Sequence, residues 1–189
     1  MTLYNGTYGF QVDYPEDWEI DVSSFASFFT SEYEDFDDLI LENISVATDD
    51  LSYYGYSDMG LDEYTDLSLD GLLTDPDYVL VDRGERDLGS YEGRYLLGGY
   101  EFGGMELEVL QIFTLSDGVV YLFTYTYESA KADLWEDTVD HMIDSFEITS
   151  FVDPASGLPT LDGVNEELAS DMPDTGVART SLIHVLQRL

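Results

Sequence analysis

The chain contains no cysteine, which excludes disulfide bonds, thiolate metal sites and lipid-modified cysteine from its chemistry. No apolar run approaches the roughly 20 residues that a membrane-spanning helix needs. The first residues, Met1 to Tyr4, lack the basic and apolar regions of a secretory signal peptide. Two locations therefore stay open: the cell surface or the extracellular space after loss of an export signal, or, alternatively, the cytoplasm.

Positive charge is almost as scarce as cysteine. Six Lys and Arg side chains stand against 41 Asp and Glu, so the formal net charge of the 189 residues is −35. Self-repulsion of this size destabilises a compact state at low ionic strength. Molar salt shortens the Debye length to about 3 Å and screens the repulsion. The composition therefore predicts a halophilic protein with hydrated salt cations at its acidic surface, and it disfavours nucleic acid and anionic membranes as partners.

Apolar residues, in contrast, are plentiful. They make up 44% of the chain and include 15 Tyr and 10 Phe, a content that disordered chains lack. Length and composition predict one folded domain over residues 1–150. Frequent Pro and Gly mark residues 151–189 as a linker-like tail.

Hydrophobic periodicity predicts a series of strands followed by a closing helix. The predicted strands cover residues 9–14, 25–30, 39–47, 78–86, 94–102, 105–115 and 119–127. Gly103-Gly104 and Asp117-Gly118 are links of the kind that joins β-hairpins. One face of the last two strands is expected to carry the core, with Glu106 and Glu108 turned to solvent. The expected core side chains are Met105, Leu107, Val109, Phe113, Tyr121, Phe123 and Tyr125.

Two helices are predicted to pack on this sheet. The first covers Leu61–Leu73, and the second follows Ser129 as its N-cap. The second helix has an apolar stripe at helical spacing, formed by Trp135, Val139, Met142, Ile143 and Phe146. The expected fold class is therefore α+β, an antiparallel sheet of about six strands packed by two helices.

The end of the chain is unusual because it lacks acids. Residues 177–189 contain no Asp or Glu, but they contain Arg179, His184 and Arg188. Apolar residues at helical spacing predict a short amphipathic helix. One interpretation is an unstructured end. The other is a candidate docking segment for an acidic groove of this fold or of a partner, carried by Arg179, Leu182, Val185, Leu186 and Leu189.

The opening of the chain resembles the PsbP-like family. The residues that carry the resemblance are Asn5 to Phe10, with Tyr8-Gly9-Phe10, and Val12 to Glu19, with Tyr14-Pro15-Glu16-Asp17-Trp18. The later order of elements agrees, so the resemblance covers about residues 3–148. It implies an α/β/α sandwich around an antiparallel sheet, here in an acidic version of the haloarchaeal type. Family members include photosystem II extrinsic proteins, a Ran-binding protein, surface lipoproteins and effector chaperones, which are binding and assembly proteins. The metal ligands of the photosynthetic members do not map onto this chain.

One segment has the spacing of a calcium loop. Asp66, Ser68 and Asp70 provide oxygens at alternate positions, Gly71 follows, and Asp77 stands where the closing acid belongs. The same residues also carry the apolar spacing of the first helix, which favours a solvated helix face. The segment is therefore a weak calcium candidate.

Catalytic signatures are weak throughout. His141 lies beside Asp140 and Asp144, and Ser145 follows, but one helix sends these groups outward and no nucleophile elbow is present. A carboxylate pair of the kind that glycosidases use cannot be identified from the sequence of a chain this acidic. No catalytic residue and no cofactor are predicted.

The sequence therefore favours a non-catalytic binding or assembly module adapted to high salt that engages a protein partner. The alternatives are a hydrolase with an unidentified carboxylate pair, a cytoplasmic chaperone and a subunit of a larger assembly. A sheet groove without convergent titratable groups would favour binding, whereas a deep pocket with a buried acid would favour catalysis.

Overall fold

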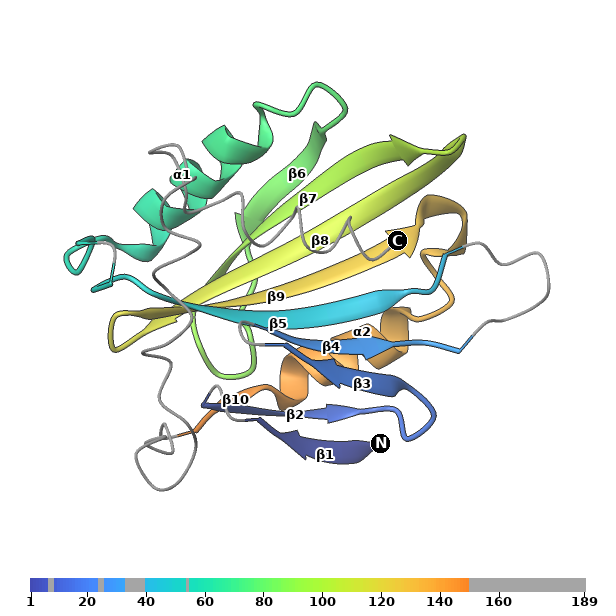
Figure 1. The fold of residues 1–189 in the computed structure, drawn as a ribbon, viewed down its shortest axis with the longest axis horizontal. Coiled ribbons are helices and arrows are strands. Elements are labelled where there is room, and N and C mark those ends of the chain that lie inside the picture. Colours follow the sequence, from blue (N-terminus) through green and yellow to red (C-terminus); the bar gives the residue numbers. More distant parts are fainter. Residues whose placement is uncertain (7–8, 24–25, 33–39, 54, 150–189) are drawn as a thin grey trace.

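The computed structural model describes residues 1–6, 9–23, 26–32, 40–53 and 55–149. These residues form two antiparallel sheets and two α-helices (Figure 1). The elements are β1 (Thr2–Asn5), β2 (Phe10–Tyr14), β3 (Glu19–Val22), β4 (Ala26–Thr30), β5 (Asn43–Asp50), α1 (Leu61–Leu72), β6 (Val79–Glu85), β7 (Gly93–Phe102), β8 (Met105–Ser116), β9 (Val119–Glu128), a 3-10 turn η1 (Ser129–Lys131), α2 (Glu136–Ser145) and β10 (Glu147–Ile148). The α+β fold class is therefore confirmed.

The larger sheet has the strand order β3-β4-β5-β9-β8-β7-β6, and the smaller one has the order β1-β2-β10. Two tight turns build the centre of the larger sheet. Asp117 and Gly118 join β8 to β9 with positive φ angles of 51° and 81°, the geometry that Asp-Gly favours. Gly103 and Gly104 join β7 to β8 in the same way, with φ of 62° and 89°. Both predicted hairpins are confirmed.

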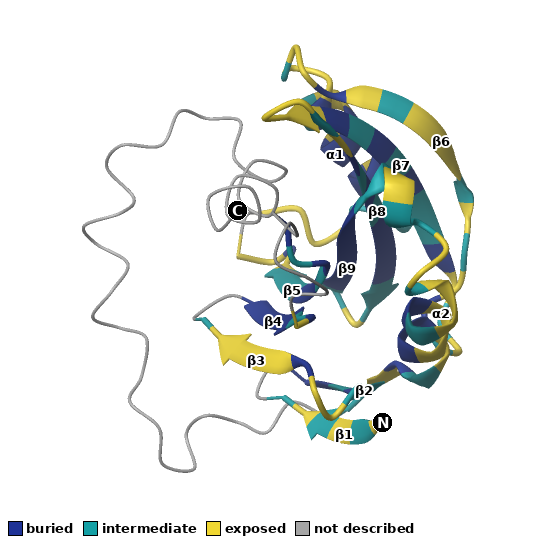
Figure 2. Cartoon of the chain, turned by 90° about the vertical axis from the view of Figure 1, so that its right-hand side faces the viewer, coloured by how far each residue is buried: buried dark blue, intermediate teal, exposed yellow. Residues whose placement is uncertain are grey.

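Helix α1 covers one face of the larger sheet, over β7 and β8. Its side chains Tyr64, Leu69 and Leu72 are buried in one core cluster with strand residues that include Leu96 and Phe113. Figure 2 shows α1 on the opposite side of the curved sheet from α2.

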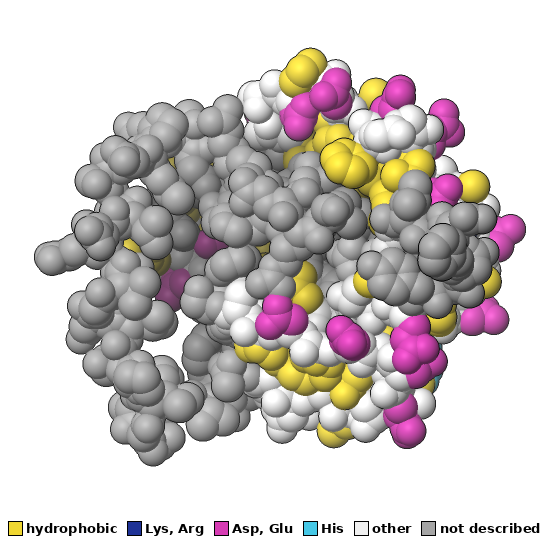
Figure 3. Space-filling view, turned by 45° about the vertical axis from the view of Figure 1, so that its right-hand side comes forward, with side chains coloured by type: hydrophobic (Ala, Val, Ile, Leu, Met, Phe, Trp, Pro, Cys, Tyr) yellow, Lys and Arg dark blue, Asp and Glu magenta, His cyan; other side chains and the backbone are white. Residues whose placement is uncertain are grey.

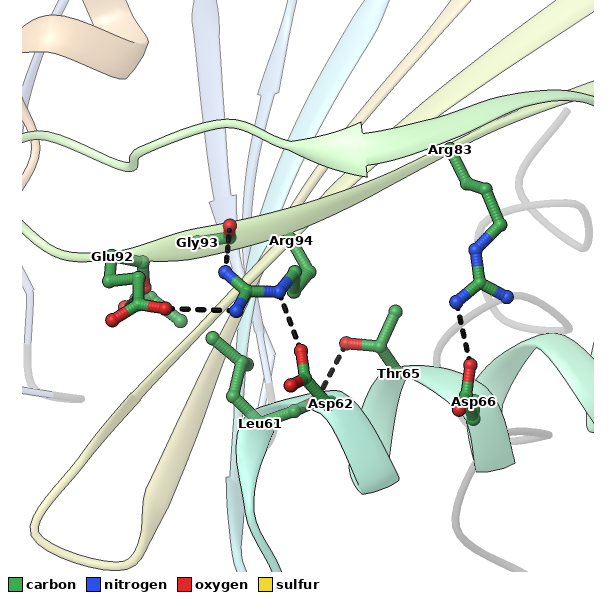
Figure 4. Close-up of polar contacts among 9 residues, drawn as sticks. Leu61, Asp62, Thr65, Asp66, Arg83, Glu92, Gly93 and Arg94 are labelled. Carbon is green, nitrogen blue, oxygen red and sulfur yellow. Dashed lines mark hydrogen bonds and ion pairs between the residues drawn. The ribbon is translucent and has the colours of Figure 1, made fainter.

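Arginines of two strands hold α1 from outside this core (Figure 4). Arg94 of β7 places Nε 2.6 Å from Asp62 Oδ1 and Nη2 2.9 Å from Glu92 Oε1. Arg83 of β6 places Nη2 2.7 Å from Asp66 Oδ1. Three of the chain's six basic residues lie in β6 and β7 or directly beside them, and two of these three are bound to carboxylates of α1.

Helix α2 covers the other face, together with the smaller sheet. Val139, Met142 and Ile143 of α2 are buried in a second cluster with residues such as Phe10 and Phe123. Phe146, which follows α2, stacks on Phe10 with ring centroids 5.6 Å apart and an interplanar angle of 17°. The cluster therefore joins the smaller sheet, α2 and the larger sheet.

Gly89 receives the end of α2. Its N–H donates to the carbonyl of Ile143 over 2.8 Å, and its φ is +60°. A Cβ at this position would lie 1.9 Å from the carbonyl oxygen of Phe146. Only glycine permits this approach, because both the φ angle and the space exclude a side chain.

The two-sided core corrects the predicted orientation of β8 and β9. Tyr121, Phe123 and Tyr125 face α2, whereas Val109 and Phe113 belong to the cluster under α1. The expectation that the seven predicted core side chains share one face is wrong, because helices cover both faces of the central strands. Strands buried on both faces lose the alternation that a half-exposed strand shows.

Several element boundaries also differ from the predicted ones. Strand β5 begins at Asn43 rather than at Leu39, which lies outside the described residues. Ser129 begins the turn η1, and α2 begins seven residues later at Glu136. Three short strands, β1, β3 and β10, were not predicted. β1 and β3 have only four residues each and pair with the next strand along the chain, whereas the two residues of β10 pair with the distant β2.

The edges of the larger sheet are β3 and β6. In β6, the register shifts between Leu80 and Asp82, which is the position of a β-bulge. Val79 and Val81 of this edge are 62% and 55% exposed. Within the part of the chain that the structure describes, neither helix has the length and apolar character needed to cross a bilayer.

Candidate binding cleft

A cleft with a volume of about 510 Å³ lies on the α2 side of the larger sheet. Strands β6 to β9 form its floor and one wall, and the segment from η1 to α2 forms the other wall. We call it the α2 cleft. Its floor is lined by Tyr95, Leu97, Leu110, Tyr125 and Tyr127, and its rim by Asp82, Glu85, Arg86, Asp133, Glu136 and Asp140.

Strand register builds the floor. Leu97 of β7 pairs with Leu110 of β8, and Leu110 pairs with Tyr125 of β9, so these three side chains form one row across the sheet. Tyr127 lies two residues further along β9 and stacks on Tyr125, with ring centroids 4.5 Å apart and an interplanar angle of 17°. The floor is therefore apolar and aromatic, and its two stacked tyrosines, Tyr125 and Tyr127, are only 4% and 8% exposed.

Two tyrosines of the cleft donate hydrogen bonds to carboxylates. Tyr95 Oη donates to Asp82 Oδ2 over 2.6 Å, and this bond lowers the pKa of the Asp82 carboxyl. Tyr127 Oη donates to Glu108 Oε2 over 2.5 Å. Burial, and then the bond to Glu108, raise the pKa of the Tyr127 phenol well above its usual range. Both phenols therefore stay protonated near neutral pH and serve as hydrogen-bond donors.

The rim is strongly acidic. Five carboxylates line it against one guanidinium, that of Arg86. Acids alone do not distinguish this site, because Figure 3 shows Asp and Glu spread over the described surface in view rather than gathered in one patch. The distinguishing feature is the combination of carboxylates with an aromatic floor.

This combination suits a cation with an apolar body. The face of a tyrosine ring attracts Lys, Arg or an alkylammonium group, and carboxylates at the rim can pair with the charge. The lowered pKa of Asp82 makes this one carboxyl a poor general acid, because an acid catalyst needs a raised pKa. Burial raises the pKa of Asp49, but this carboxyl accepts a hydrogen bond from Tyr64 of α1 and lies on the other side of the sheet.

The calcium candidate residues lie elsewhere and do not form a loop. Asp66, Ser68 and Asp70 are part of α1 (Figure 4 shows Asp66), and Asp77 follows the helix. Ser68 is buried, and Asp66 pairs with Arg83. A helix distributes successive side chains around its circumference, whereas a calcium loop directs them to one point. Across the described ranges, no three His, Cys, Asp or Glu side chains gather as metal ligands.

The His141 and Ser145 pair has structural contacts. Ser145 Oγ accepts a hydrogen bond from the Asp13 backbone N–H over 3.0 Å and donates to the Met142 carbonyl over 3.1 Å. His141 Nε2 lies 3.5 Å from Asp13 Oδ2. These contacts attach α2 to β2. The candidate docking residues Arg179, Leu182, Val185, Leu186 and Leu189 lie outside the described residues.

No protein-family model matches the chain, and no curated protein matches it by sequence. Solved structures match by fold. A cyanobacterial PsbP protein from Synechocystis has a TM-score of 0.58 at 20% identity, with 78% of this chain and 91% of that chain covered. A Pseudomonas aeruginosa protein of unknown function has a TM-score of 0.55 at 18% identity, with coverage of 77% and 94%. LpqN from Mycobacterium tuberculosis has a TM-score of 0.50 at 18% identity, with coverage of 74% and 83%. The chain therefore has a PsbP-like fold.

Proposed function

We propose that this chain is a non-catalytic module that binds a protein partner, and that the α2 cleft receives a partner segment in which basic and apolar side chains alternate. The observation that carries the proposal is the row formed by Leu97, Leu110 and Tyr125, stacked on Tyr127 and bordered by carboxylates. The apolar side chains of the segment would lie on the floor, and its Arg or Lys side chains would reach the rim.

Salt decides which contacts supply the affinity. Ion pairs at an exposed rim contribute about 0–1 kcal/mol each, and molar salt weakens them further. Contacts of apolar side chains with Leu97 and Leu110 are not screened, and cation–π contacts contribute about 0.5–2 kcal/mol. In a high-salt solvent, the floor therefore supplies most of the affinity. The acidic rim favours a partner segment with positive charge over one with negative charge.

The fold comparisons are compatible with a place at the cell surface, which we include in the proposal. LpqN, which shares the fold, is involved in cell-envelope biogenesis. Protease treatment of intact cells tests this location: a surface protein is cleaved, whereas a cytoplasmic protein is protected until the cells are lysed.

The binding proposal can be tested with a designed probe. A peptide of alternating Arg and Leu, about ten residues long, is titrated into the full chain in molar KCl by calorimetry. A peptide of alternating Asp and Leu with the same length is the control. We expect binding of the Arg peptide and none of the Asp peptide.

Two protein variants locate the binding site. Glu136→Lys reverses a charge on the cleft rim and should weaken binding of the Arg peptide about fivefold. Glu106→Lys makes the same change on an exposed residue that does not line the cleft and should leave the affinity unchanged. Equal effects of the two variants, or equal binding of both peptides, would contradict a specific role of the cleft.

A further inference from the structure

The face of the larger sheet opposite the α2 cleft contains an area without charge. Register places Phe28, Ser45, Thr124 and Gln111 in one row across β4, β5, β9 and β8. A neighbouring row begins with Ala26 and Ala47. We call this area, which also includes Thr126, the neutral face.

The absence of acids from the neutral face is informative because the chain carries 41 of them. At its edge, where the same face meets solvent, charged residues are present: Glu19 and Asp21, on the strand β3, pair with Thr30 and Phe28 and are exposed. Phe28, Ser45, Thr124 and Gln111 are buried. Helix α1 packs on β7 and β8, and no described helix lies over β4 and β5 on this side (Figure 2).

A second observation indicates that a partner is missing from the described contacts. Thr126 is 0% exposed, and its Oγ1 has no hydrogen-bond partner among the described residues. Register pairs Thr126 with Asn43 and Val109 and places it on the neutral face. A buried hydroxyl usually has a partner, because leaving it unpaired costs about 1–3 kcal/mol.

We propose that the neutral face binds residues 177–189 of the same chain as a short amphipathic helix. This segment contains two arginines and no acid, and Leu182, Val185, Leu186 and Leu189 form its apolar stripe. Small residues on the face, such as Ala47 and Ser45, let a helix approach the sheet closely. With the helix laid across the strands, one of its two arginines, Arg179 or Arg188, would lie near Glu19 and Asp21 of the edge strand β3, which complement its charge.

The dimensions agree with this proposal. A helix over residues 177–189 would be about 20 Å long, which matches the width of four strands at about 4.8 Å spacing. The described chain ends at Thr149, whose N–H donates to the Gly9 carbonyl over 2.8 Å. Residues 150–176 can span up to about 90 Å when extended, so the segment reaches any part of the domain.

Attachment to the same chain also favours this occupant. A flexible linker gives the segment an effective concentration in the millimolar range. A dissociation constant of about 0.1 mM would therefore leave the face about nine-tenths occupied. A second copy would instead bring another net charge of −35 to the same place. The proposal is independent of the α2 cleft, which lies on the other side of the sheet.

Hydrogen exchange of the full chain in molar KCl, followed by mass spectrometry, tests the proposal. We expect amides of residues 177–189 to exchange about tenfold or more slowly than in the variant Leu182→Asp/Leu186→Asp. The control variant Leu158→Asp/Leu161→Asp adds the same charge outside the segment and should leave the protection intact. Exchange of residues 177–189 at unprotected rates in the wild-type chain would overturn the proposal.

A face variant completes the test. Ala47→Asp places a charge on the neutral face and should release the segment, whereas Val22→Asp, on an exposed position that points to the other face, should not. If Ala47→Asp fails to fold, the comparison of Leu182→Asp/Leu186→Asp with its control variant still tests whether the segment binds. Protection that grows with protein concentration, together with a dimer by light scattering, would assign the face to a second copy and overturn the intramolecular contact.

Discussion

Arg86 Nη2 lies 2.5 Å from Asp140 Oδ1, and this ion pair joins the residue that follows β6 to α2 beside the α2 cleft. The two side chains are 36% and 54% exposed, so the pair contributes at most about 1 kcal/mol to stability. Its larger effect is on the charge of the cleft, because Arg86 is the one basic residue among the lining residues and it neutralises one rim carboxylate.

Replacing Arg86 should therefore improve binding of a basic segment. Arg86→Gln removes a like charge from the cleft and releases Asp140, so we expect the Arg–Leu peptide to bind about two- to fivefold more tightly. The melting temperature should change little. Arg83→Gln breaks the similar pair with Asp66 on the other side of the sheet and serves as the control. A gain in affinity from both variants would mean that only net charge matters.

Stability should increase with salt. The net charge of −35 predicts that screening stabilises the compact state. We expect the melting temperature to rise steadily between about 0.1 and about 2 M KCl, as followed by circular dichroism. Sucrose stabilises proteins because it is excluded from their surface, and it does not screen charge. It should therefore raise the melting temperature less than KCl does. An unchanged melting temperature across the KCl series would contradict the interpretation of the charge.

Two glycines with positive φ should respond differently to alanine. At Gly118, with φ +81°, a Cβ meets nothing within 4 Å, so Gly118→Ala should cost only the backbone strain of about 1–2 kcal/mol. At Gly89, the Cβ would also meet the carbonyl of Phe146 at 1.9 Å. Gly89→Ala should therefore cost more than about 3 kcal/mol or prevent folding. Urea denaturation measures the free energy of unfolding of both variants. Equal losses of stability would contradict the close contact between Gly89 and the end of α2.

Two neighbouring carboxyl groups at the end of β5 should show opposite pH dependence. Burial raises the pKa of Asp49, although the hydrogen bond from Tyr64 Oη opposes this, and the charge of Asp50 adds to it. Hydrogen bonds from Ser52 are the main cause that lowers the pKa of Asp50. The folded state thus holds the Asp49 proton more tightly than the unfolded chain does. Its contribution to stability is present below the unfolded pKa and is lost as the pH rises through the folded pKa. The contribution of Asp50 is present above its unfolded pKa and is lost as the pH falls through its folded pKa.

Amide substitutions separate these two contributions. Asp49→Asn removes a charge that is costly to bury, and its amide oxygen can still accept the bond from Tyr64. We therefore expect a higher melting temperature than the wild type at neutral pH and a smaller difference in mild acid. Asp50→Asn keeps an oxygen that can accept the bonds from Ser52 but loses the charge that strengthens them, so it should lower the melting temperature at neutral pH. A shift of the same sign in both variants would show that only the net charge had mattered.

Local signals explain how much of the fold could be predicted. The strands joined by Gly103-Gly104 and Asp117-Gly118 combine apolar runs with turn residues, and both signals lie within a few residues. The extra strands have no such signal: β3 is exposed at all four positions, and β10 has two residues. The central strands are apolar on both faces, so the pattern of Val109 and Phe113 could not reveal which helix they meet.

Part of the α2 cleft could have been predicted from the sequence. Two-residue turns fix register, so the two hairpins alone place Leu97, Leu110 and Tyr125 in one row. The position of α2 beside this row was not predictable, because α2 begins at Glu136 after the turn η1 and not at Ser129. Without α2 the row is only part of a sheet, whereas with it the row becomes the floor of a cleft.

The bulge in β6 has a consequence for how the molecule stays separate from its neighbours. An open sheet edge is a template for strands of other molecules, and many proteins protect it with charged side chains. In molar salt, repulsion extends only about 3 Å, so Asp82 and Glu85 would not keep a second sheet away. The shift between Leu80 and Asp82 interrupts the straight row of amides and carbonyls beside the exposed Val79 and Val81. The bulge therefore protects the edge against fibre growth by its geometry. This protection remains in molar salt, which screens the protection by charged side chains.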